Sequence, residues 1–133
     1  MLALPAALQE NLRAEARAAF PAECCGLLEG TREEGGVVRV LAIHCAANLA
    51  FDPTQGFEID PAVHFRLLRG LRGSGREVVG CYHSHPNGRA APSDRDRATG
   101  CADGFVWVII ATGVNEGIVA FQGPTFLPLA LQG

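Results

Sequence analysis

The sequence CYHSHPNGRAAPSDRD, residues 81–96, is the stretch around which the rest of the chain is organised. Side chains alternate between the two faces of a β-strand, so His83 and His85 are expected to point the same way. Pro86 cannot donate to a strand ladder and therefore ends the strand. Ser93 then has the features of a helix N-cap. The stretch predicts a strand, a turn and a helix start that lie close to one another.

Asp96 falls on the first turn of this predicted helix, where the helix dipole favours a carboxylate. Imidazoles and carboxylates are ligands of zinc, and three protein ligands leave a fourth position for water, as in catalytic zinc sites. His83, His85 and Asp96 are therefore the predicted metal ligands. Ser93-x-x-Asp96 is also close to an ordinary capping box, so a structural reading stays open for these two residues.

A zinc-bound water also needs a group that takes its proton and passes one to the leaving group, and a carboxylate is the usual choice. Glu23 is the candidate, because it stands at the start of a predicted buried strand. The alternative is a solvated glutamate, which is the common state of this residue type. Ser93 likewise has a second reading, as a hydroxyl that donates to the oxyanion of a tetrahedral intermediate.

Length and charge limit the remaining possibilities. The chain has 133 residues, enough for one domain with a core of its own. Its net charge of −3 gives no electrostatic reason to expect nucleic-acid binding. All eleven basic residues are arginine, which excludes a catalytic lysine. The longest apolar run, residues 105–112, is too short to span a bilayer, and charged residues interrupt the N-terminus as they would not in a signal peptide.

The cysteines indicate a reduced, cytoplasmic chain. Their number is odd and no C-x-x-C pair occurs, so they are expected to be free thiols that pack as small core residues. Cys81 alternates with His83 and can be either a thiolate ligand or a buried neighbour of the site, of which the second is favoured. His44 and His64 lack a partner at ligand spacing and are expected to be structural. The cysteines are Cys24, Cys25, Cys45, Cys81 and Cys101.

Hydrophobic periodicity predicts an alternation of helices and strands along the whole chain. The resulting fold class is α/β or mixed α+β, with one mixed sheet flanked by helices in a single domain over residues 1–133. The second helix counts Phe65, Leu68 and Leu71 among its apolar positions. Helices are expected over residues 2–20, 61–72 and 93–102, and strands over 23–30, 37–46, 77–85, 105–112, 117–122 and 126–131.

Glu23, the segment His83-Ser84-His85-Pro86, Ser93 and Asp96 together resemble the JAMM, or MPN-plus, metallopeptidases. The pattern of that family is Glu…His-x-His-x7-Ser-x2-Asp, and every position of it is present at the right spacing. Residues 21–28, PAECCGLL, look like the opening of the small prokaryotic, Mec-like or deubiquitinase-like members. The resemblance therefore extends over Glu23 to Asp96 by motif.

The resemblance implies a fold, a cofactor and a reaction. The fold is a central mixed sheet flanked by helices, with a cytidine-deaminase-like architecture. The cofactor is one Zn²⁺ per chain, bound by His83, His85 and Asp96, with Glu23 as acid and base and Ser93 supporting the oxyanion. The reaction is cleavage of the amide bond after the C-terminal Gly-Gly tail of a ubiquitin-like or sulfur-carrier protein. The residues leave open whether an isopeptide or a single-residue peptide bond is cut.

Three other functions compete with this interpretation. A non-catalytic MPN-type binding module is disfavoured because a scaffold does not need the complete set of five motif residues. A RadC-like protein shares a similar H-x-H-P…P-S-x-x-D segment, but the CCGLL opening at residues 24–28 argues against it. A zinc nucleobase deaminase is disfavoured because the H-x-E and P-C-x-x-C signature is missing. The short interval from Asp96 to Phe105 leaves no room for the zinc-bearing insertion of some eukaryotic deubiquitinases.

Overall fold

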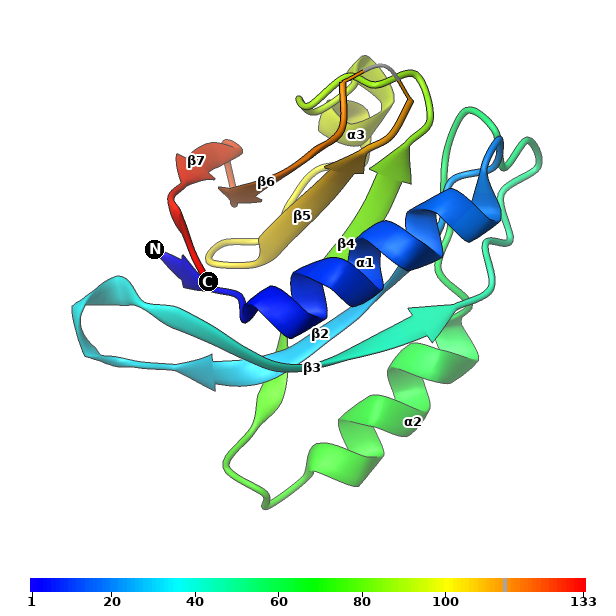
Figure 1. Ribbon diagram of the computed structural model, residues 1–133. Coiled ribbons are helices and arrows are strands. Elements are labelled where there is room, and N and C mark those ends of the chain that lie inside the picture. Colours follow the sequence, from blue (N-terminus) through cyan, green and yellow to red (C-terminus); the bar gives the residue numbers. More distant parts are fainter. Residues whose placement is uncertain (114) are drawn as a thin grey trace.

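A computed structural model describes residues 1–113 and 115–133 (Figure 1). The described strands form one eight-stranded sheet in the order β7-β6-β5-β4-β2-β3-β1-β8. The sheet is mixed, because β4 pairs parallel with β5 and antiparallel with β2. The elements are β1 (Leu2–Ala3), α1 (Ala6–Ala19), β2 (Cys25–Arg32), the 3₁₀ turn η1 (Glu34–Gly36), β3 (Val38–Ala46), α2 (Pro61–Leu71), β4 (Glu77–His85), α3 (Asp94–Thr99), β5 (Val106–Ala111), β6 (Gly117–Gln122), β7 (Leu127–Leu129) and β8 (Leu131–Gln132).

Alternation along β4 divides the interior into two cores, one on each face of the sheet. Tyr82 points into the first core, in which Leu12 and Ala16 of α1 pack against the sheet. Cys81 points into the second core, which Val63 and Leu67 of α2 help to cover. The predicted α/β class, a mixed sheet flanked by helices, is confirmed.

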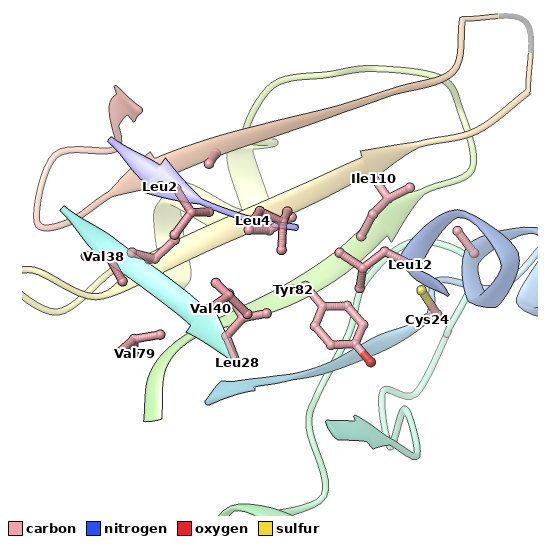
Figure 2. Packing of buried hydrophobic residues seen from close by; sticks show 14 residues of the cluster. Leu2, Leu4, Leu12, Cys24, Leu28, Val38, Val40, Val79, Tyr82 and Ile110 are labelled. Carbon is pink, nitrogen blue, oxygen red and sulfur yellow. The ribbon is translucent and has the colours of Figure 1, made fainter. Parts of the chain in front are cut away.

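The first core is aliphatic apart from Tyr82 and Cys24. Figure 2 shows Leu12 of α1 facing Tyr82 and Ile110, side chains that come from β4 and β5. These side chains are at most 1% exposed. Full burial of a side chain of this size stabilises a fold by about 1.5–3 kcal/mol, so this core holds α1 and the central strands in fixed relation.

A partly buried hydrogen bond ties α1 to the sheet beside this core. The Tyr82 hydroxyl donates to the carboxylate of Glu15 in α1, at 2.8 and 2.9 Å from its two oxygens. Gly26 of β2 makes room for the ring, because a Cβ at position 26 would overlap the Tyr82 hydroxyl and the carbonyl oxygen of His44. Burial raises the pKa of Glu15, while the hydrogen bond from Tyr82 acts in the opposite direction.

Two predicted elements at the chain ends were wrong in their extent. The first helix does not begin at Leu2, because the amides of Leu2 and Leu4 donate to Ala130 and Gln132, which makes this segment a strand. The predicted strand over 126–131 is two strands, β7 and β8, which lie at opposite edges of the sheet although one residue separates them. The sheet must therefore curl until its two edges approach each other. The twist between neighbouring strands accumulates across a sheet and produces curvature of this kind.

The second and third helices differ from the sequence interpretation in smaller ways. The predicted cap of α2 is confirmed, since Asp60 accepts a hydrogen bond from the Ala62 amide at 2.9 Å. Phe65 and Leu68 do not serve the core, as their exposed fractions are 61% and 51%. Helix α3 is shorter than expected, because Gly100 follows Thr99 with φ of 83° and ends the helix. No helix among the described residues is long and apolar enough to cross a membrane.

The substitution Tyr82→Phe tests the role of the buried pair. It should lower the free energy of unfolding by about 1–3 kcal/mol, because the half-buried Glu15 carboxylate loses its donor. Chemical denaturation of this variant, of Glu15→Gln and of the double variant gives the coupling energy between the two side chains. If the two single effects simply add, the hydrogen bond is not the contact that holds α1 to the sheet.

Candidate metal centre

Three buried side chains meet where β4 ends and α3 begins. The Nε2 atoms of His83 and His85 are 3.0 Å apart, so the two rings do point the same way. Oδ2 of Asp96, on the first turn of α3, lies 3.2 Å from Nε2 of His83 and 3.1 Å from Nε2 of His85. All three residues are at most 5% exposed. The three atoms form a nearly equilateral triangle.

This triangle has the dimensions of one face of a zinc coordination tetrahedron. Metal–nitrogen and metal–oxygen bonds of about 2.0–2.1 Å place neighbouring ligand atoms of a tetrahedron roughly 3.3–3.4 Å apart. The negative charge of Asp96 also favours a cation at this point. The donor set therefore fits a divalent metal, with the fourth position of the tetrahedron left for water or substrate.

Glu23 lies next to the triangle, just before β2. One of its carboxylate oxygens and one nitrogen from each imidazole lie within 4.8 Å of one another. Its backbone is held on both sides, since its amide donates to Pro53 at 2.7 Å and its carbonyl accepts from the Asn48 side chain at 3.0 Å. Burial raises the pKa of Glu23 to about 7, although the neighbouring His85 acts in the opposite direction. A carboxyl group with this pKa can accept and return a proton at neutral pH.

The turn after β4 orients His85. Its Nδ1 lies 2.8 Å from the carbonyl oxygen of Arg89, which can only accept a hydrogen bond, so Nδ1 carries the proton. The Nε2 lone pair is therefore free to bind a metal, an arrangement that is common for metal-binding histidines. Gly88 allows this turn, because its φ of 77° lies in the left-handed region, and the side chain of Asn87 accepts from the Arg89 amide at 2.9 Å.

Ser93 and Asp96 form the capping box that the sequence suggested. The Asp96 amide donates to the Ser93 hydroxyl oxygen at 3.0 Å, and the Ser93 amide donates to Oδ2 of Asp96 at 2.9 Å. The Ser93 oxygen acts here as an acceptor, so its own proton remains available for another partner. Burial alone would raise the pKa of Asp96, but its close contacts with the imidazoles of His83 and His85 and the hydrogen bond from the Ser93 amide outweigh it and hold this pKa well below its usual range.

Aromatic rings around His83 were not anticipated from the sequence. Phe57 stacks on the imidazole with ring centroids 4.1 Å apart and an interplanar angle of 17°, and Trp107 meets the imidazole edge-on at 5.5 Å. Burial lowers the pKa of His83, which keeps the ring neutral. Its Nδ1 has no hydrogen-bond partner in residues 1–113 and 115–133. Phe57 belongs to a loop far from residue 83 in sequence, and periodicity carries no signal for such a contact.

The other candidates lie outside the cluster. Cys81 lines an apolar cavity of about 470 Å³ together with His64 and Trp107. His44 is 2.9 Å from the buried Glu29 carboxylate, which Arg76 also contacts at 2.8 Å, so it has the structural environment expected. All five cysteines are free.

With this geometry in view, comparison with known sequences assigns the chain to a class. Residues 5–122 match the family described as "Prokaryotic homologs of the JAB domain". The protein belongs to this family of JAB, or MPN, domains. The resemblance to small prokaryotic JAMM proteins is thereby confirmed.

Two curated relatives have names that state an activity. One is the "Desampylase" of Haloferax volcanii, 33% identical over 111 residues, which are 84% of this chain and 78% of the relative. The other is the "Probable TtuB-protein conjugate cleaving protease" of Thermus thermophilus, 33% identical over 96 residues, 72% of this chain and 61% of the relative. Both relatives agree with the predicted enzyme class, a JAMM-type hydrolase.

Solved structures agree with the fold. The solution structure of protein DSY2949 from Desulfitobacterium hafniense superposes with a TM-score of 0.85 at 27% identity, over 99% of this chain and 92% of that protein. A JAB1/MPN domain protein from Archaeoglobus fulgidus superposes with a TM-score of 0.59 at 19% identity, over 98% of this chain and 92% of that protein. The second likeness concerns the fold alone.

The raised pKa of Glu23 predicts how stability depends on pH in metal-free protein. Folding favours the protonated carboxyl, so this group should lower the free energy of unfolding as pH rises from its ordinary pKa of 4.5 towards 7. Denaturation of chelator-treated wild type and Glu23→Gln between pH 4 and about 8 isolates the contribution. Over this interval the free energy of unfolding of the wild type should fall relative to that of Glu23→Gln. A constant difference would mean that Glu23 is not buried as described.

Proposed function

We propose that the protein is a zinc-dependent peptidase or isopeptidase. Its substrate is a ubiquitin-like or sulfur-carrier protein, and the bond cut is the amide bond after the C-terminal Gly-Gly tail. The observation that supports this most directly is the position of Glu23, a buried carboxyl with a pKa near 7, beside the triangle of His83, His85 and Asp96. Residues 1–133 would act as one catalytic domain, in the cytoplasm, where five free thiols remain reduced.

His83, His85 and Asp96 would hold the zinc ion, which when bound supplies a Lewis acid and lowers the pKa of water to about 7. Glu23 would accept the proton of the attacking water and deliver it to the leaving nitrogen. The free hydroxyl proton of Ser93 would be donated to the carbonyl oxygen of the substrate as negative charge develops there. Phe57 and Trp107 keep water away from the buried side of His83.

The site also suits a glycine tail. A cavity of about 400 Å³ opens beside the cluster, lined by Glu23, His85 and Ser93 and by the backbone-rich turn that follows β4. A substrate chain in this cavity must approach the protein backbone closely, and glycine permits such an approach and unusual dihedral angles. The names of the two curated relatives support a carrier-protein conjugate as the substrate class. The folded body of the carrier would then supply selectivity, and neither nucleic acid nor a membrane is expected as a partner.

Metal analysis tests the ligand set. The wild type should carry one zinc ion per chain, whereas His83→Ala and Asp96→Ala should lose it, because two remaining ligands hold zinc far more weakly than three. His44→Ala provides the control, since this histidine pairs with Glu29 outside the cluster. Full zinc content in both cluster variants would overturn the assignment.

Hydrolysis tests the reaction itself. A Gly-Gly-tailed carrier protein extended by one residue should be cleaved after the second glycine, whereas an unrelated unfolded protein should stay intact. A chelator should stop the reaction. Glu23→Gln should keep its zinc and fold but lose about 10²–10⁴-fold in rate, as expected for a lost acid–base group.

The controls separate three outcomes of this experiment. Equal cleavage of the unfolded protein would show a general peptidase. Turnover by Glu23→Gln near the wild-type rate would remove Glu23 from the mechanism. Binding of the carrier by the zinc-loaded wild type without any cleavage would indicate a non-catalytic binding module instead.

A further inference from the structure

An arginine is among the residues that line the same cavity as the proposed acid–base group. Arg89 lines this cavity together with Glu23, Asn87, His85 and Ser93. Its guanidinium makes no hydrogen bond or ion pair with any of the described residues, whereas Arg13, like several other surface arginines, pairs with an acidic side chain. Arg89, a residue of the cavity wall, thus carries a permanently charged guanidinium that no described residue pairs with.

The position of Arg89 is fixed relative to the cluster. Its carbonyl oxygen accepts the hydrogen bond from Nδ1 of His85 at 2.8 Å, and its amide donates to the side chain of Asn87 at 2.9 Å. The residue that orients a predicted metal ligand therefore also lines the space that a substrate would occupy. Because the backbone of Arg89 is already held, only its side chain has to be ordered when it binds an anion, which limits the entropy lost.

We infer that Arg89 forms a carboxylate-binding subsite on the leaving-group side of the scissile bond. The inference rests on the proposed function, because Glu23 must reach the leaving nitrogen and Arg89 shares its cavity. In a carrier extended by one amino acid, the α-carboxylate is two bonds from that nitrogen. Guanidinium and carboxylate match in geometry and form paired, charge-assisted hydrogen bonds. A lysine isopeptide has no carboxylate at this distance, so the subsite selects a single-residue extension.

The reaction selected in this way balances with water alone. The bond between the last glycine carbonyl carbon and the nitrogen of the added residue breaks. The water oxygen joins the glycine carbon and forms the new carboxylate of the carrier. The nitrogen leaves as the amine of a free amino acid, whose own carboxylate stays bound to Arg89 until the product departs.

Binding without turnover gives the first test. Two synthetic peptides that end in Gly-Gly-Ala, one a free acid and one a carboxamide, are titrated into zinc-loaded Glu23→Gln and followed by NMR shifts. The acid should bind about tenfold more tightly than the amide. Introducing Arg89→Gln as a second substitution in this variant should abolish the preference for the acid. Introducing Arg89→Lys instead should keep part of it. The matched control is Arg69→Gln, because Arg69 carries the same charge but lies over the Phe65 ring and does not line the cavity.

The outcomes separate this inference from the proposed function. A preference for the acid that disappears only with Arg89→Gln supports the subsite. A lower KM for cleavage of the acid-terminated carrier than of the amide-terminated carrier would show that the subsite also acts in the reaction. Equal binding of acid and amide, or a preference that survives Arg89→Gln, overturns the subsite even if the enzyme cleaves carriers well. Absence of cleavage with a normal acid preference would overturn the proposed hydrolysis and leave the subsite standing.

Discussion

One carboxylate oxygen connects the fold to the site. Oδ2 of Asp96 accepts the backbone hydrogen bond that starts α3 and at the same time faces Nε2 of both His83 and His85. The same oxygen atom therefore both caps the helix and completes the polar cluster. Movement of α3 relative to the end of β4 would carry Asp96 away from the two imidazoles, so the helix cannot drift without loss of the cluster.

One face of β4 packs into the hydrophobic core, and the other face carries residues of the candidate metal site. On one face Tyr82 is buried in an aliphatic core and bonded to Glu15 of α1, which holds the strand in place. On the other face, one residue later, His83 is packed against Phe57 and Trp107. Rigid packing of this kind keeps catalytic groups within small tolerances of a working geometry, and the apolar surroundings strengthen the electrostatic interactions inside the site.

The same neighbourhood gives two carboxyl groups opposite properties. Asp96 lies against two imidazoles and accepts a hydrogen bond from a backbone amide, which lower its pKa and keep it ionised as a ligand must be. Glu23 is buried without comparable donors, and its pKa rises to about 7. Environments that separate the pKa values of nearby acids are how proteins assign them different roles.

The sequence by itself determined the features that local rules control. Strand alternation put His83 and His85 on one face, a proline and a helix cap located Ser93 and Asp96, and residue spacing then marked the family resemblance. The position of Phe57 beside His83, the exposure of Phe65, and the separation of β7 from β8 were decided by tertiary structure alone. These features depend on contacts between residues distant in sequence and on the curl of the whole sheet, and no local periodicity encodes either of them.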